Sequence, residues 1–155
     1  MKDFKYLHVL NSYLLNGAYT KFLNSGALPC VVLEEVSTLP SIVLDLALID
    51  VNPNTDITVK VICGHEDTSE TLDVDCIYRI INEGDNLDTK ANATLNETPT
   101  TPGTAYERFD IDYTIPSTAF DANSCLNIVI QRDNSGADTG DLYVYQLWVY
   151  QGELL

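Results

Sequence analysis

From residue 31 onward, runs of Val, Ile, Leu and Tyr alternate with clusters of Asp, Asn, Gly, Pro, Ser and Thr. This pattern is typical of β-strands separated by turns. In residues 109–115 every second side chain is apolar, which predicts a strand with one buried and one solvated face. The predicted strands are Val31–Val36, Ile42–Val51, Ile57–Cys63, Leu72–Asn82, Ala105–Ile115, Cys125–Arg132 and Leu142–Gln151. Without helix–strand alternation, they predict an all-β fold, an antiparallel two-sheet β-sandwich of jelly-roll-like type.

The first 30 residues have a different pattern, for which two interpretations stay open. Phe4, Leu7, Leu10 and Leu14 recur every three or four positions, as on one face of a helix. Gly17 and the apolar residues at the remaining positions fit equally well with an extended arm that docks on the sandwich or on a neighbour. We therefore divide the chain into an N-terminal arm or short helix, 1–30, and a β-sandwich domain, 31–155.

Two later segments stand out. Residues 142–150 are apolar on both faces, which predicts a strand that lies centrally in a sheet or beneath a partner subunit. Residues 83–104 contain two prolines and many polar residues, so we expect a long irregular loop, of the kind that is usually functional or mobile.

The charge of the chain excludes several classes of function. Its 155 residues suit one domain, and 8 Lys and Arg against 23 Asp and Glu give a net charge of −15. Such a charge repels phosphate backbones and anionic lipids, so we expect neither nucleic-acid nor membrane binding. No apolar run approaches the ~20 residues of a membrane span, and the first residues do not resemble a signal peptide.

The four cysteines, Cys30, Cys63, Cys76 and Cys125, are spread too widely for a zinc knuckle or a redox motif. Cys63 and Cys76 flank a polar turn and form the most plausible disulfide pair, facing each other across a hairpin. The interpretation we favour is four unpaired thiols that pack as small hydrophobic residues in a reducing compartment.

Candidate catalytic and metal-binding residues do not form a known catalytic motif. His8 and His65 lack a neighbouring nucleophile sequence and a second pair of zinc ligands. Two carboxylate pairs, Asp73 with Asp75 and Asp110 with Asp112, are interpreted as solvated strand faces rather than acid–base couples. No phosphate-binding glycine loop is present. We therefore expect a protein that is not an enzyme and has no cofactor.

The segment 133–141 has a composition that suits a hard cation such as Ca²⁺, although its spacing differs from that of an EF-hand. Its candidate ligands are Asp133, Asp138 and Asp141. A structural role is the other interpretation: the Arg132 guanidinium can hold this loop in place through paired bonds.

Aromatic residues are concentrated in the last predicted strand. Strict alternation places Tyr143 and Tyr145 on one face and Trp148 and Tyr150 on the other. Exposed aromatic residues on a sandwich stack on sugars or anchor a protein partner, whereas buried ones fill the core.

The carboxyl-terminal part of the chain resembles a known class of proteins. The resemblance lies in residues 126–133, 136–143 and 147–150, preceded by 106–116, which together cover roughly the last 50 residues. These segments are similar to the closing strands of β-sandwich virion proteins of tailed bacteriophages, found in head-decoration, fibre and tail components.

That resemblance implies a non-enzymatic structural protein of the virion, with capsid decoration or cementing as its role. It also implies a homotrimer that contacts the major capsid protein. The residues expected to bind partners are Phe4, Leu7, Leu10, Leu14, Tyr143, Tyr145 and Trp148. The alternative function is a carbohydrate-binding or receptor-binding fibre or tail module, in which the exposed aromatic residues contact a glycan.

Overall fold

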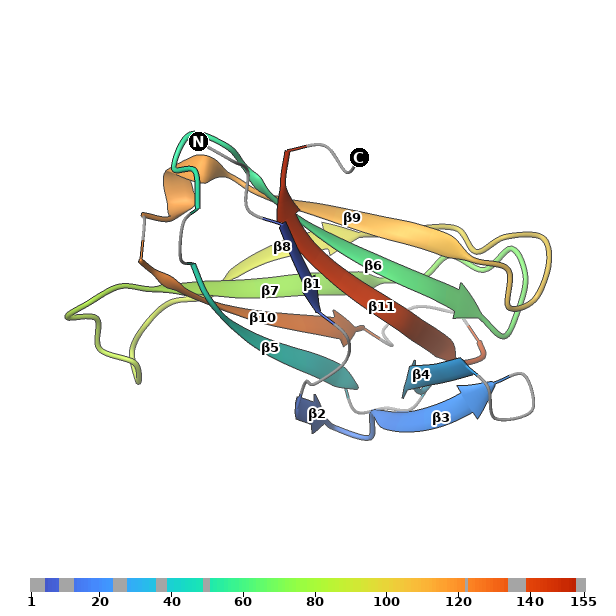
Figure 1. The fold of residues 1–155 in the computed structure, drawn as a ribbon. Coiled ribbons are helices and arrows are strands. Elements are labelled where there is room, and N and C mark those ends of the chain that lie inside the picture. Colours follow the sequence, from blue (N-terminus) through green and yellow to red (C-terminus); the bar gives the residue numbers. More distant parts are fainter. Residues whose placement is uncertain are drawn as a thin grey trace.

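The computed structural model describes residues 5–8, 13–23, 28–35, 39–48, 51–121, 123–133 and 139–152, which form two packed antiparallel sheets (Figure 1). The strands are β1 (Lys5–His8), β2 (Tyr13–Leu15), β3 (Tyr19–Leu23), β4 (Leu28–Leu33), β5 (Ser41–Ala47), β6 (Ile57–His65), β7 (Val74–Ile81), β8 (Ala93–Glu97), β9 (Phe109–Ile115), β10 (Cys125–Arg132) and β11 (Leu142–Gln151). A 3₁₀ turn, η1 (Ser117–Ala119), lies between β9 and β10. Within the described ranges no helix is long and apolar enough to cross a membrane.

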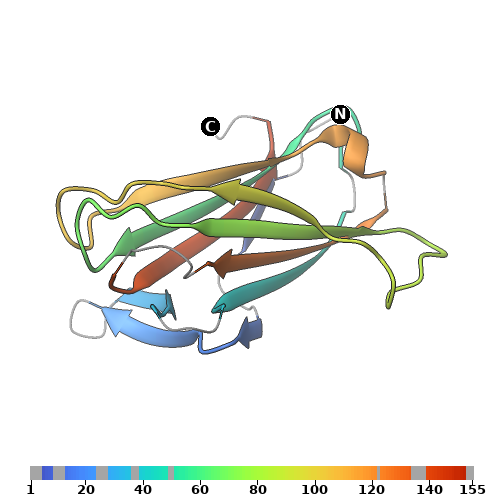
Figure 2. The same ribbon diagram turned by 180° about the vertical axis from the view of Figure 1, so that it is seen from behind.

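Each sheet contributes one layer of the sandwich. The six-stranded sheet has the order β3-β4-β11-β6-β9, and β1 pairs with β11 beside β4. The five-stranded sheet has the order β2-β5-β10-β7-β8. Figures 1 and 2 show the two layers from opposite sides. Because β4 pairs with residues 142–144 and β1 with residues 147–150, both flank the same edge of β11.

The core lies between the sheets and follows the period of two in the sequence. In β10, Leu126, Ile128 and Ile130 alternate inward and are fully buried. The Tyr113 hydroxyl of β9 donates a 2.8 Å hydrogen bond to the Val74 carbonyl, which links the two sheets through the core.

The predicted fold class is confirmed: the chain is an all-β, two-sheet antiparallel sandwich of the jelly-roll kind. The bounds of β10 and β11 coincide with the predicted ones, and β11 is central in its sheet, as its apolar pattern predicts. Of the two interpretations of residues 1–30, the described parts adopt the extended one, because β1, β2 and β3 are strands. The domain division at residue 30 stays a prediction.

The long irregular loop predicted for 83–104 is wrong in part, since β8 lies within it and pairs with β7. Only Leu95 of β8 is half-buried and its other four residues are exposed, so this edge strand lacks the apolar alternation that marks the others. Residues 99–102 are also fixed, because backbone bonds join Leu72 to Pro99 and Thr101 to Glu70.

Cys63 and Cys76, named above as the most plausible pair should a disulfide form, do not face each other across a hairpin. Cys63 lies in β6 and Cys76 in β7, and these consecutive strands belong to different sheets instead of forming a hairpin. All four cysteines are free; Cys125 is exposed and the other three are buried. Burial raises the pKa of the Cys76 thiol to about 12, so it stays protonated at neutral pH.

Candidate functional site

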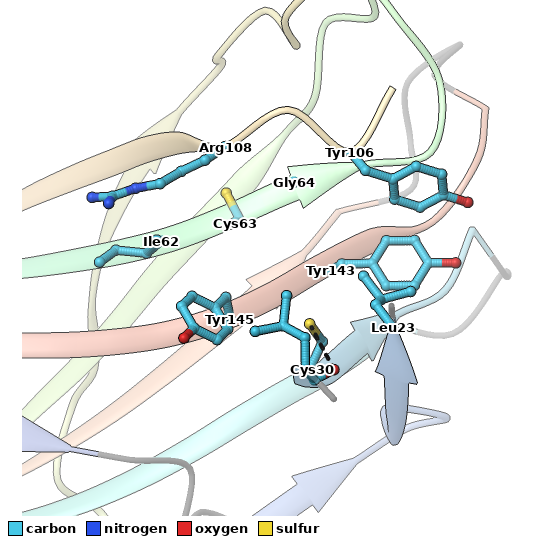
Figure 3. Close-up of a pocket in the computed structure, with 10 residues that line it drawn as sticks. Leu23, Cys30, Ile62, Cys63, Gly64, Tyr106, Arg108, Tyr143 and Tyr145 are labelled. Atoms are coloured by element: carbon cyan, nitrogen blue, oxygen red, sulfur yellow. Dashed lines mark hydrogen bonds between the residues drawn. The ribbon is translucent and has the colours of Figure 1, made fainter. Parts of the chain in front are cut away.

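A hollow of about 210 Å³ opens on the outer face of the six-stranded sheet, the face turned away from the core (Figure 3). We call it the tyrosine hollow. Tyr106 and Tyr143 lie together at one end of it, and Tyr145 and Arg108 lie toward the other. It is lined by Leu23, Leu28, Cys30, Ile62, Cys63, Gly64, Tyr106, Arg108, Tyr143 and Tyr145. The lining therefore combines aromatic and aliphatic side chains with one guanidinium, the composition typical of small-molecule sites.

A β-bulge in β11 sets which side chains face outward. The pairing with β6 shifts between Val144 and Gln146, so Tyr145 is an extra residue in the strand. Leu147 and Val149 therefore point into the core together with Val144. We predicted that Trp148 and Tyr150 lie on the face opposite to Tyr143 and Tyr145, and the bulge makes this prediction wrong. Trp148, which pairs with Lys60 across the strands, faces outward like Tyr143.

The position of Tyr106 depends on a close backbone approach. Its N–H donates a 2.7 Å bond to the carbonyl of His65, at the end of β6. Tyr106 has φ +62°, in the left-handed region that side chains rarely adopt. A Cβ on Gly64 would lie 3.1 Å from the Tyr106 carbonyl oxygen, so glycine at position 64 lets this loop rest on the strand.

Tyr106 and Tyr143 form an edge-to-face pair with ring centroids 5.3 Å apart. The Lys21 ammonium of β3 donates a 3.1 Å bond to the Tyr143 hydroxyl and lies 5.2 Å from the centre of that ring. Burial, followed by the charge of Glu66, raises the pKa of the Tyr143 hydroxyl. Both tyrosines are therefore fixed aromatic surfaces with protonated hydroxyls at neutral pH.

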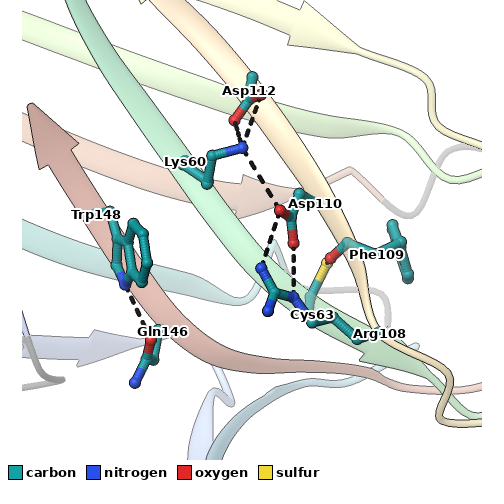
Figure 4. A network of polar contacts seen from close by, with 8 residues as sticks. All are labelled: Lys60, Cys63, Arg108, Phe109, Asp110, Asp112, Gln146 and Trp148. Atoms are coloured by element: carbon teal, nitrogen blue, oxygen red, sulfur yellow. Dashed lines mark hydrogen bonds and ion pairs between the residues drawn. The ribbon is translucent and has the colours of Figure 1, made fainter. Parts of the chain in front are cut away.

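A strip of ion pairs borders the tyrosine hollow on the β9 side (Figure 4). Arg108 donates two 3.1 Å bonds to the two carboxylate oxygens of Asp110. Lys60 pairs with Asp112 at 2.8 Å and with Asp110 at 3.5 Å. The hydrogen bonds from Arg108 hold the pKa of Asp110 below its usual range. We define the polar strip as Lys60, Arg108, Asp110 and Asp112. It offers hydrogen-bond donors and acceptors beside the aromatic side chains of the tyrosine hollow.

Beyond the tyrosine hollow the outer face continues along β11. The indole N–H of half-buried Trp148 donates a 2.9 Å bond to the Gln146 side chain, two residues before it on the same face (Figure 4). This bond orients the indole ring next to Lys60, its cross-strand partner.

The structure brings together three of the predicted partner-binding residues and separates others. Tyr143, Tyr145 and Trp148 share the outer face of the six-stranded sheet. Leu14 is half-buried and packs against the core. Leu7 lies in β1, where its backbone pairs with that of Trp148 in β11. Phe4 and Leu10 lie outside the described residues.

Sequence reasoning did not assign Lys21, Lys60 or Arg108 to a site, and it placed Tyr106 in a strand that begins at Ala105, whereas β9 begins at Phe109. The strict alternation of β9 does identify Asp110 and Asp112 as outward-facing. Nothing in the sequence indicates that the turn before β9 folds back over Gly64, so Tyr106 and Arg108 had no recognisable signal.

The predicted calcium loop is only partly described, because Asp138 lies outside the described residues. The Asp141 carboxylate accepts a bond from the Glu35 N–H, and the described residues contain no group of three His, Cys, Asp or Glu that could hold a metal ion. Arg132 is fully buried and donates to the carbonyls of Leu33, at 3.1 Å, and Gly140, at 2.7 Å, so it bonds both to β4 and to the residue preceding Asp141.

The remaining candidates have structural contacts. His65 is buried, and its ring nitrogen Nδ1 lies 3.1 Å from the N–H of Asp67. Asp73 and Asp75 both accept hydrogen bonds from the Asn96 amide, which joins β8 to the start of β7. The side chain of His8 lies outside the description.

Comparison with solved structures identifies similar folds. A xylan-binding domain from CBM 22 aligns with 99% of this chain and 98% of its own length, at 10% identity and a TM-score of 0.55. TmCBM61, solved with β-1,4-galactotriose, aligns over 92% and 90%, at 10% identity and a TM-score of 0.52. The K1 cleaved adhesin domain of Lys-gingipain from Porphyromonas gingivalis W83 aligns over 98% and 97%, at 12% identity and a TM-score of 0.57. Neither a protein-family profile nor the sequence of a curated protein matches the chain.

These findings correct the expectation of a virion structural protein. Carbohydrate-binding modules and an adhesin domain match over nearly the whole of both chains. A bacteriophage tailspike domain matches 92% of this chain but only 20% of its own, and none of these structures is a capsid decoration protein. The closing-strand pattern therefore reports a sandwich architecture shared by proteins with different roles. The capsid partner and the trimer were implied by that resemblance alone and have no support.

Proposed function

We propose that this chain is a carbohydrate-binding domain whose site is the outer face of the six-stranded sheet. The observation that carries the proposal is the tyrosine hollow, in which Tyr106, Tyr143 and Tyr145 meet Arg108. A sugar ring has an apolar face of C–H groups and a rim of hydroxyls. Tyrosine rings cover the first, and the charged side chains of the polar strip bond to the second.

The site is preorganised, which lowers the entropic cost of binding. Tyr106 is fixed by its backbone bond to His65, and Tyr143 by Lys21 and by its contact with Tyr106. The whole-chain likeness to carbohydrate-binding modules supports the same function at the level of fold.

We further propose that the domain binds its ligand without chemical conversion. The two carboxylates of the polar strip are each engaged by a cation, and the low pKa of Asp110 keeps it ionised. An ionised carboxylate that is bonded on both oxygens is poorly suited to donate a proton as a general acid.

Isothermal titration calorimetry against cello-, xylo-, manno- and galacto-oligosaccharides tests this function. We expect at least one series to bind, and Tyr145→Ala to weaken that binding by about tenfold or more, because a central aromatic contact is lost. Leu87→Ala is the matched control, since Leu87 is 64% exposed on the β7–β8 hairpin, away from this face. Absence of binding to every series, or equal losses in both variants, would contradict the proposal.

A further inference from the structure

The outer face of the six-stranded sheet is built of repeating cross-strand rows. Successive rows join Gln146 to Ile62 and Asp110, and Trp148 to Lys60 and Asp112. A third row joins Tyr150 to Thr58 and Thr114. Each row follows the last after two residues, so a side chain on β11 recurs at a constant interval in the same row as a polar side chain on β9, with β6 between them.

Three aromatic residues of this face offer surface to a ligand, one from the turn before β9 and two from β11, and we call them the aromatic line. Tyr106 is 48% exposed and Tyr145 is 36% exposed, and Trp148 is half-buried farther along β11. Tyr143 is buried beneath Tyr106 and forms the floor at that end. The aromatic line therefore starts in the tyrosine hollow and continues outside it.

The polar strip runs beside this aromatic line. Arg108 and Asp110 lie at the level of the tyrosine hollow, and Lys60 and Asp112 lie at the level of Trp148 (Figure 4). The Asp112 side chain is 52% exposed, so it can accept bonds from ligand hydroxyls at the far end. Hydrogen-bonding groups are thus present along the whole line and not at one point.

The line is longer than one sugar. Gly64, opposite Tyr143, and Lys60, opposite Trp148, are four residues apart on β6. At about 3.3 Å per residue, this separation is roughly 13 Å, which exceeds the length of a pyranose ring.

Resting on the proposed function, we infer that the ligand is a linear, uncharged oligosaccharide of several sugars, which lies along β11 from Tyr106 to Trp148. It is uncharged because Lys60 and Arg108 are already paired with carboxylates, and the net charge of −15 of the chain repels an acidic ligand. A site for a single terminal sugar would use the tyrosine hollow alone.

A series of oligosaccharides of increasing length tests this inference. Trp148 is the only tryptophan of the chain, so its fluorescence reports on the far end of the site. The full chain is titrated with the mono- to hexasaccharide of the neutral series that binds best. Affinity is followed by calorimetry and the indole environment by tryptophan fluorescence. We expect affinity to increase with length up to about three or four sugars. The tryptophan emission should shift with the longer ligands but not with the monosaccharide.

Two variants locate the far end of the line. Trp148→Ala should weaken binding of the tetrasaccharide by about fivefold or more and leave the monosaccharide or disaccharide unaffected. Ile77→Ala, at a half-buried position on the outer face of the other sheet, is the control for lost packing. Should Trp148→Ala unfold, Asp112→Asn replaces it, because the Asp112 side chain is exposed. This variant should likewise weaken binding of the tetrasaccharide more than that of the monosaccharide.

The outcomes separate the two proposals. If sugars bind with the same affinity at every length, or if Trp148 emission does not respond to long ligands, the linear ligand is overturned while carbohydrate binding stands. If oligogalacturonate binds more tightly than neutral chains, the uncharged class is overturned. If no saccharide binds, it is the proposed function itself that fails.

Discussion

At the scale of single residues, Gly64 controls the placement of Tyr106. The Cβ that any other residue would add faces a backbone oxygen, not a movable side chain, and that oxygen belongs to a loop held by its own 2.7 Å bond. The loop must therefore move if Gly64 is replaced.

Gly64→Ala tests this dependence. We expect the free energy of unfolding to fall by about 1 kcal/mol, because overpacking outweighs the smaller entropy of the unfolded alanine chain. Saccharide affinity should fall with it, as Tyr106 leaves the tyrosine hollow. Urea denaturation and calorimetry measure the two effects. Gly103→Ala is the control, since nothing lies within 4 Å of its added Cβ. Unchanged affinity in Gly64→Ala would show that Tyr106 is not held as described.

Arg132 illustrates what the sequence reveals at this scale. An arginine before a loop rich in Asp and Gly predicts a tie between strand and loop, and the guanidinium does bond to the Gly140 carbonyl. Its second described partner, the Leu33 carbonyl, comes from a strand 99 residues away in the sequence. Contacts of that kind depend on the tertiary arrangement and have no local signal.

At the scale of elements, the bulge at Tyr145 determines the composition of the outer face. Without it, strict alternation would turn Trp148 toward the core and Leu147 toward solvent. With it, one extra aromatic residue is displayed and the aromatic line continues past the tyrosine hollow.

Deletion of Tyr145 tests the role of the bulge. The remaining sequence alternates regularly, with Val144, Leu147 and Val149 still inward, so we expect a folded protein. Saccharide binding should be lost, because the hollow loses a ring. Deletion of Leu147 is the contrasting control: once the bulge is lost, it turns Gln146 into the core in place of Leu147 and should unfold the chain. Circular dichroism and calorimetry distinguish the two. A deletion of Tyr145 that unfolds, or that binds normally, would contradict this account.

The elements show why part of the structure could be predicted from sequence. β10 was predicted to the residue because one of its faces is apolar and its bounding turns are polar. β8 was not predicted, because an exposed edge strand needs no apolar alternation. The bulge in β11 was not predicted either. Because β11 is apolar on both faces, its sequence fits equally well with strict alternation and with an alternation shifted by one residue.

At the scale of the whole molecule, the two sheets differ in what their outer faces carry. The outer face of the six-stranded sheet carries the tyrosine hollow and the polar strip, including Lys21, Lys60 and Arg108. The outer face of the five-stranded sheet carries side chains such as Val43, Ile77 and Val129, which lie in one cross-strand row. The fold is shared with binding modules, whereas the function depends on these particular residues.

The most direct measurement of the central claim is a map of the binding site on the intact chain. Amide and indole chemical shifts of the ¹⁵N-labelled protein are followed during titration with the neutral hexasaccharide that binds best. We predict saturable shifts at Gly64, Tyr106, Tyr145 and the Trp148 indole, with those of Ile77 and Val129 unchanged. Shifts confined to the five-stranded sheet, or none with any of the four saccharide series, would contradict it.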